Sequence, residues 1–132
     1  MKVTLIQTSG PTWSDVNSQV GVNGKADILF DYDDIHNSIN NILSCPIGSR
    51  GWHPTFGSDV PFLIWEPVDL ITANAIKVST IVAIKQWEPR ITLVAGQSSI
   101  IPNSDGISYT VNLVYQVNLT GAVNTYTFRL AR

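Results

Sequence analysis

The carboxyl-terminal part of the sequence alternates between apolar and mostly polar residues, and this pattern constrains the fold more than any other. The apolar positions are Ile107, Tyr109, Val111, Leu113, Tyr115, Val117 and Leu119. A period of two predicts a long β-strand with one apolar face. Turn-forming residues at 102–106 and 120–122 flank this run, so neighbouring strands are expected to pair with it as hairpins.

These hairpins predict a three-stranded antiparallel β-meander. The period changes to two from Ile91 onward, which supplies the first strand. The strand through 107–119 is the second. Tyr126, Phe128 and Leu130 keep the same spacing and predict the third.

Two main helices are predicted ahead of the meander. Apolar residues at 35, 39, 42 and 43 share one helical face, an acidic cluster at 31–34 suits the helix start, and Pro46 ends the helix. The second helix is predicted over 69–87, with Thr72 as its N-cap. Its β-branched residues favour a strand, but nineteen residues without a turn signal are too many for one. The fold class is therefore α+β, with the helices packed on the meander.

The length of 132 residues fits one folded domain. Residues 8–24 are polar and glycine-bearing, and Val3 and Leu5 before them could form a short strand. We therefore expect residues 1–24 to form an N-terminal extended arm or loop, followed by a single α+β domain over 25–132. A net charge of −2 with only 14% charged residues argues against nucleic acid or anionic membranes as partners. The lone Cys45 excludes an intramolecular disulfide, and the start lacks a signal-peptide core, so folding in the cytoplasm is expected.

No catalytic, metal or cofactor site is predicted. The spacing of His36, His53 and Cys45 matches no zinc pattern. A glycosidase-like pair could be drawn from the acids Asp59, Glu66, Asp69 and Glu88. Arg90, two residues after Glu88, instead favours an ion pair that keeps this carboxylate charged.

Two short segments rich in proline, glycine and charge have restricted conformations. The first is the loop 48–59, in which Arg50 and Asp59 could form a closing ion pair while Trp52 and Phe56 anchor the loop in the core. The second is Glu88-Pro89-Arg90. The alternative for both is a protein interface, because aromatic and arginine residues are typical of binding hot spots.

The two segments, in this order and spacing, resemble the baseplate wedge family of contractile-tailed phages, which is related to a type VI secretion baseplate component. The resemblance covers roughly residues 24–101 and rests on Gly48-Ser49-Arg50, Pro54, Phe56-Gly57, Asp59 and Glu88-Pro89-Arg90. It implies a structural protein of the virion tail baseplate, assembled in the host cytoplasm, with one copy in each wedge and six in a baseplate.

The resemblance also implies partners. The segment Glu88-Pro89-Arg90 would dock on the core bundle of larger wedge proteins, and the C-terminal sheet would template the first ring of the tail sheath protein. The protein-interaction residues expected are Glu88, Pro89, Arg90, Arg50, Trp52, Phe56 and Asp59. The alternative function is a tail-associated, lysozyme-like peptidoglycan hydrolase.

Overall fold

The structure, a computed structural model, describes residues 14–16 and 28–132. The chain divides into two units, Met1–Ser38 and Ile39–Arg132, with the boundary inside the first helix. Each unit is described by itself below.

The first unit holds a two-stranded antiparallel ribbon and the start of helix α1. Strand β1 (Ser14–Val16) pairs with β2 (Ile28–Phe30). α1 (Tyr32–Ser44) follows, with Asp33 and Asp34 in its first turn, as predicted for carboxylates at the positive end of a helix dipole. β1 falls in the segment expected to be an arm or loop. The rest of residues 1–24, with a short strand expected near Val3 and Leu5, lies outside the described residues.

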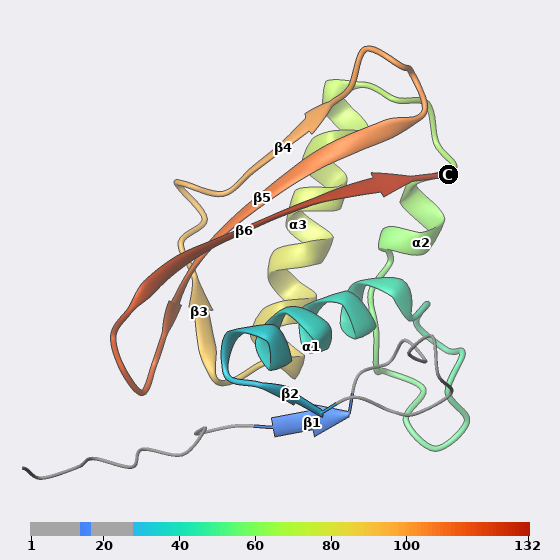
Figure 1. Cartoon of the computed structure of the whole chain (residues 1–132). Coiled ribbons are helices and arrows are strands. Elements are labelled where there is room, and N and C mark those ends of the chain that lie inside the picture. The colour runs from blue at the N-terminus through green and yellow to red at the C-terminus, as the bar shows by residue number, and fades with distance from the viewer. Residues whose placement is uncertain (1–13, 17–27) are drawn as a thin grey trace, which may run out of the picture. The chain divides into compact units, whose positions relative to one another are not determined.

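The second unit is built on a four-stranded antiparallel sheet (Figure 1). Its strands are β3 (Ile91–Leu93), β4 (Ser99–Pro102), β5 (Ser108–Val117) and β6 (Val123–Ala131). β5 is central, with β6 on one side and both β3 and β4 on the other. The predicted α+β class and the order of the meander are confirmed, but the sheet has four strands instead of three.

The extra strand arises because the first strand of the meander is interrupted at residues 94–98. The backbone N–H of Val114 on β5 donates to the hydroxyl of Ser98 at 3.0 Å instead of to a backbone carbonyl. The same hydroxyl donates to the carbonyl of Val94 at 3.0 Å. Ser98 thus replaces one backbone acceptor in the ladder, and β3 and β4 follow one another along the same edge of β5.

The alternation along β5 produces the core as predicted, except at the two ends of the predicted run, where Ile107 and Leu119 lie outside the strand and are 52% and 67% exposed. Its odd-numbered residues from Tyr109 to Val117 are buried. In the register of the sheet, Val111 lies opposite Phe128 and Leu113 opposite Tyr126, so the apolar side chains of β6 share this face. The side-chain amide of Asn40 donates to the Tyr126 hydroxyl at 2.8 Å, which places the second half of α1 beside β6.

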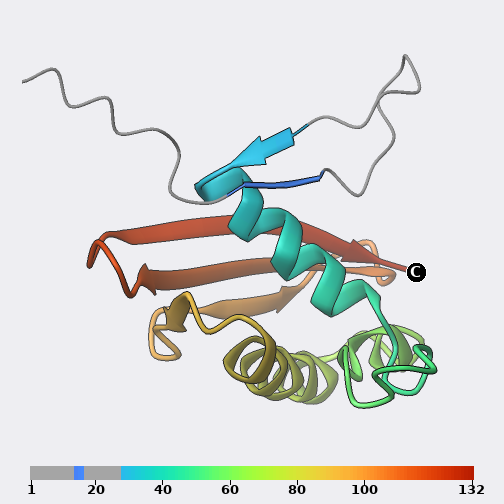
Figure 2. The ribbon, with the colours of Figure 1, turned by 90° about the horizontal axis from the view of Figure 1, so that it is seen from below.

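Helix α3 (Leu70–Trp87) runs along the sheet next to β3 and β4 (Figure 2). Its buried face contains Ile76, Thr80, Ala83 and Ile84, as the helical spacing predicts. The N-cap is Asp69, not Thr72, because the Asp69 carboxylate accepts the backbone N–H of Thr72 at 2.7 Å. Among the described helices, none has both the length and the apolar character needed to cross a bilayer.

A one-turn helix, α2 (Val60–Leu63), lies between the loop 48–59 and α3. The apolar run at 60–65 predicts a short buried turn of helix or strand. Val60 is buried, but Phe62 and Trp65 are 59% and 69% exposed. The expectation of burial is therefore wrong for the two largest side chains of this segment.

Candidate functional site

The loop 48–59 is closed onto the end of α1 by backbone hydrogen bonds. The N–H of Ser58 donates to the carbonyl of Cys45 at 2.9 Å, and Pro46 and Ser58 form a parallel bridge. Within the loop, the N–H of Gly48 donates to the carbonyl of Pro54 at 2.8 Å. The predicted fixed shape is thus produced mainly by the main chain.

Ser58 and Gly57 make the closure possible. The buried hydroxyl of Ser58 donates to the carbonyl of Leu43 and accepts the N–H of Val60. Leu43 lies in the last turn of α1, where carbonyls have no partner within the helix. Gly57 has a φ of +118°, and a Cβ at this position would lie 2.1 Å from the Cys45 carbonyl oxygen. Only glycine fits here without displacing backbone.

The charged and aromatic side chains of the loop make other contacts than the sequence predicts. The guanidinium of Arg50 lies 4.2 Å from the centre of the Phe56 ring, a cation–π contact. No ion pair joins Arg50 to Asp59 among the described residues, so that expectation is wrong. Phe56 is half-buried and packs against Trp87 with ring centres 5.1 Å apart.

Trp52 is 96% exposed. The expectation that it anchors the core is wrong. A large aromatic side chain left in solvent at the tip of a fixed loop is typical of a binding surface. Its role in an interface, like that of the other six residues proposed for protein interaction, stays a prediction.

Glu88-Pro89-Arg90 is held in one conformation at the end of α3. The predicted ion pair is present and bidentate, with Arg90 Nε and Nη2 at 2.6 and 2.7 Å from the two Glu88 carboxylate oxygens. The side chain of Glu88 is 3% exposed and that of Arg90 25%. Pro89 is exposed, and its carbonyl accepts the side-chain amide of Asn118 at 2.8 Å. The segment therefore presents Pro89 and the edge of Arg90 on a fixed backbone.

The acids considered for a glycosidase-like pair have other roles or lie exposed. Glu88 is paired with Arg90. Asp69 caps α3, and the N–H of Thr72 holds the pKa of its carboxyl below the usual value, whereas a general acid needs a raised pKa. Asp59 and Glu66 are exposed. Within the part of the chain that the structure describes, no three metal-ligating side chains come together.

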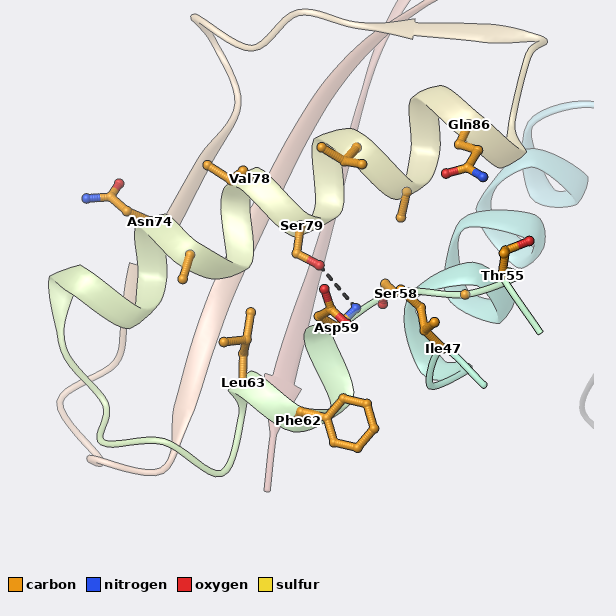
Figure 3. Close-up of a pocket in the computed structure, with 14 residues that line it drawn as sticks. Ile47, Thr55, Ser58, Asp59, Phe62, Leu63, Asn74, Val78, Ser79 and Gln86 are labelled. Carbon is orange, nitrogen blue, oxygen red and sulfur yellow. Dashed lines mark hydrogen bonds between the residues drawn. The ribbon is translucent and has the colours of Figure 1, made fainter. Parts of the chain in front are cut away.

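Sequence reasoning missed an open apolar groove between α3, α2 and the loop. We call it the α3 groove; its cavity measures about 740 Å³, and its lining includes Ile47, Asp59, Phe62, Leu63, Val78, Ser79 and Val82 (Figure 3). Phe62, Val78 and Val82 are more than half exposed. The sequence of α3 does contain a sign of this groove, because the helix carries apolar residues on both faces. Burial of both faces within the fold is the simpler interpretation of that pattern.

The outer edge of β6 is a second surface of interest. The backbone N–H of Arg132 donates to the carbonyl of Ile107, and the backbone N–H of Val117 donates to the carbonyl of Ala122. In the antiparallel register these bonds place the N–H groups of even-numbered β6 residues toward β5. The N–H groups of Val123, Thr125, Thr127, Arg129 and Ala131 consequently face outward. Among the described strands, only β5 pairs with β6.

Known proteins with related sequences are baseplate components. Residues 31–121 match the family described as "Baseplate wedge protein gp25". Baseplate protein W of Escherichia phage P2 is 36% identical over 91 residues, which cover 69% of this chain and 76% of that protein. Baseplate wedge protein gp25 of Enterobacteria phage T4 is 26% identical over 107 residues, which cover 80% of each chain.

Two solved structures share the fold. The crystal structure of a putative tail lysozyme from Geobacter sulfurreducens has a TM-score of 0.69 at 24% identity and covers 80% of this chain and 96% of its own. A chain of the post-contraction baseplate of pyocin R2 has a TM-score of 0.53 at 21% identity, covering 82% and 92%. At these identities the likeness concerns the fold alone. The family match spans more than half of the sequence, and the chain therefore belongs to the baseplate wedge protein gp25 family.

Proposed function

We propose that this protein is a non-enzymatic component of the baseplate wedge of a contractile tail. In this proposal it docks on the core bundle of the larger wedge proteins and templates the first ring of tail sheath, with six copies in each baseplate. Assembly takes place in the host cytoplasm, and the mature protein resides in the virion tail. The observation that carries the templating role is the outer edge of β6.

An open edge strand of this kind favours pairing with a strand of another chain. Its outward N–H and carbonyl groups provide main-chain hydrogen bonds at every second residue. Soluble proteins usually protect such edges with lysine, proline or bulges, and β6 contains neither lysine nor proline. Its one basic residue, Arg129, is engaged with Asp105 and donates to Ser108. A sheath arm that adds a strand here is therefore the partner we propose.

The docking role rests on the loop 48–59 and on Glu88-Pro89-Arg90. Both segments have fixed backbones, and they expose Trp52 and Pro89. Preformed, rigid surfaces lose little conformational entropy on binding, which suits the permanent contacts of an assembly.

The non-enzymatic part of the proposal has its own test, because a putative tail lysozyme shares the fold. We expect purified protein to leave a peptidoglycan suspension turbid and to release no reducing sugar from pH 4 to pH 8. The reason is that Glu88 is committed to Arg90 and Asp69 to its helix. Turnover that disappears in Glu66→Gln or Glu88→Gln would establish the hydrolase instead.

The templating role is tested by Thr125→Pro. Thr125 lies mid-strand with its N–H facing outward, so proline removes one donor from the free edge without breaking a bond to β5. We expect the variant to fold and to enter baseplates, while particles lack extended sheath in electron micrographs. Thr125→Ala, which keeps the N–H, is the matched control and should support normal sheaths.

Two results would contradict this role. Normal sheaths on Thr125→Pro particles would show that the edge is not used. An assembled baseplate in which the outer edge of β6 faces solvent would show the same directly.

A further inference from the structure

The outer face of α3 carries a regular apolar stripe that the fold leaves uncovered. It consists of Ile71, Ala75, Val78 and Val82, at successive spacings of four, three and four residues. Ile71, Val78 and Val82 are 80%, 62% and 57% exposed, whereas Ile76 and Ile84 on the opposite face are buried. A 4-3-4 spacing is the seam with which one helix packs against another in a coiled coil.

Three residues of this stripe, Ala75, Val78 and Val82, line the α3 groove, and α2 supplies its second wall. Figure 3 shows Phe62 and Leu63 of α2, and Ile47 just before the loop, around the cavity that α3 borders. Asp59 is the one charged residue among the described residues that line it. The Asp59 carboxylate makes no capping bond to α2, while its backbone N–H donates to the Ser79 hydroxyl at 3.2 Å. The groove therefore combines an apolar floor with one negative charge at its rim.

We propose that the α3 groove binds an amphipathic helix from another protein of the baseplate. That helix carries an apolar seam with three- and four-residue spacings, and a lysine or arginine that faces Asp59. The apolar stripe determines that the partner is a helix, and the charge of Asp59 determines its complementary residue. The assignment of the partner to the baseplate rests on the proposed function.

Charge argues against a second copy of this chain as the occupant. Asp59 lies beside Ser79, close to the midpoint of α3 (Leu70–Trp87). Two copies paired antiparallel along α3 would therefore bring their Asp59 carboxylates near the twofold axis, where like charges repel. A small ligand fits less well, because the groove is open and would leave much of a small molecule exposed, whereas small-molecule sites usually enclose most of their ligand.

Photocrosslinking in assembled particles tests this assignment. p-Benzoylphenylalanine is introduced at position 78 or 82, in the groove, and at the exposed position 97 as a control. After irradiation, peptides joined to the probe are sequenced. We expect positions 78 and 82, but not 97, to join one segment of a different baseplate protein, with the spacing described above and a basic residue.

Variants provide a quantitative readout. Val78→Glu places a charge in the apolar seam, so we expect incorporation into baseplates to fall at least about tenfold, or ~1.4 kcal/mol. Leu119→Glu changes an apolar side chain of similar exposure away from the groove and should incorporate normally. Both variants should match the parent protein in thermal unfolding, because neither side chain is buried.

A charge reversal tests the role of Asp59. Asp59→Lys should weaken incorporation, and replacing the crosslinked basic residue by glutamate should restore it. Crosslinks to a second copy, or baseplates in which the groove is bare and Val78→Glu incorporates normally, would overturn this inference while leaving the proposed function intact. Absence of the protein from baseplates would instead refute the proposed function.

Discussion

Replacing Gly57 by alanine is expected to destabilise the folded domain by about 4 kcal/mol. Two costs add at this position. The φ of +118° is strained for any residue with a side chain, at about 1–3 kcal/mol. The new Cβ would also lie 2.1 Å from the carbonyl oxygen of Cys45, a backbone atom that cannot move without breaking its bond to Ser58. Overpacking of this kind costs a further 1–3 kcal/mol or so.

Urea denaturation followed by circular dichroism measures this loss. Gly48→Ala is the matched control, because Gly48 also has a positive φ, of +87°, but no atom of the described residues lies within 4 Å of the position its Cβ would take. We expect Gly48→Ala to cost only about 1 kcal/mol, the backbone strain alone. Equal losses at the two positions would show that contact with Cys45 is unimportant. Since whole domains are stable by about 5–15 kcal/mol, Gly57→Ala could leave much of the protein unfolded.

The loop shows where sequence reasoning stops. Its glycines, prolines and aromatics predicted a fixed shape, and its backbone bonds agree with that prediction. Position 57 requires glycine because its backbone lies close to Cys45, twelve residues earlier in the chain. A contact of this kind cannot be predicted from the neighbouring residues in the sequence. The position of Trp52 was missed for a related reason. Phe56 packs against Trp87 and is covered by Arg50, so a single aromatic residue is sufficient to anchor the loop.

The sheet was predictable because period-two alternation is a local property of the chain. β5 and β6 follow it residue by residue. The break between β3 and β4 was not predictable, because it depends on one serine hydroxyl that replaces a main-chain acceptor. The replacement of a backbone acceptor by a serine hydroxyl leaves the hydrophobic periodicity of the sequence unchanged.

Helix α3 illustrates a different limit. Its length predicted a helix against β-branched propensity, and that prediction is confirmed. The buried face was predicted too, but the outer stripe at Ile71, Val78 and Val82 was not separated from the core. When both faces of a helix are apolar, the sequence cannot distinguish the face that packs within the domain from the face available to a partner. That distinction required the positions of β3 and β4 along one side of α3.

Arg90→Ala is expected to be the second most damaging change, with a loss of about 3 kcal/mol in the isolated domain. The placement of Glu88 and Arg90 at the end of α3, taken alone, predicts that the fold would tolerate their loss. The burial of Glu88 changes this expectation, because removing Arg90 leaves a carboxylate that is 3% exposed without its bidentate partner. Breaking a buried ion pair from one side typically costs about 3–5 kcal/mol, and the partial exposure of Arg90 places this pair near the lower end.

A set of variants separates this internal role from docking. Glu88→Gln combined with Arg90→Ala removes the buried negative charge together with its arginine partner, so we expect it to recover 1–2 kcal/mol or so of the loss in urea denaturation. Arg90→Lys keeps the charge but loses the two-pronged geometry, and should cost about 1 kcal/mol. If folded Arg90→Lys protein fails to enter baseplates, the shape of the guanidinium matters to a partner as well as to Glu88. If Arg90→Ala is as stable as the parent domain, the ion pair does not support the fold, and docking becomes its main role.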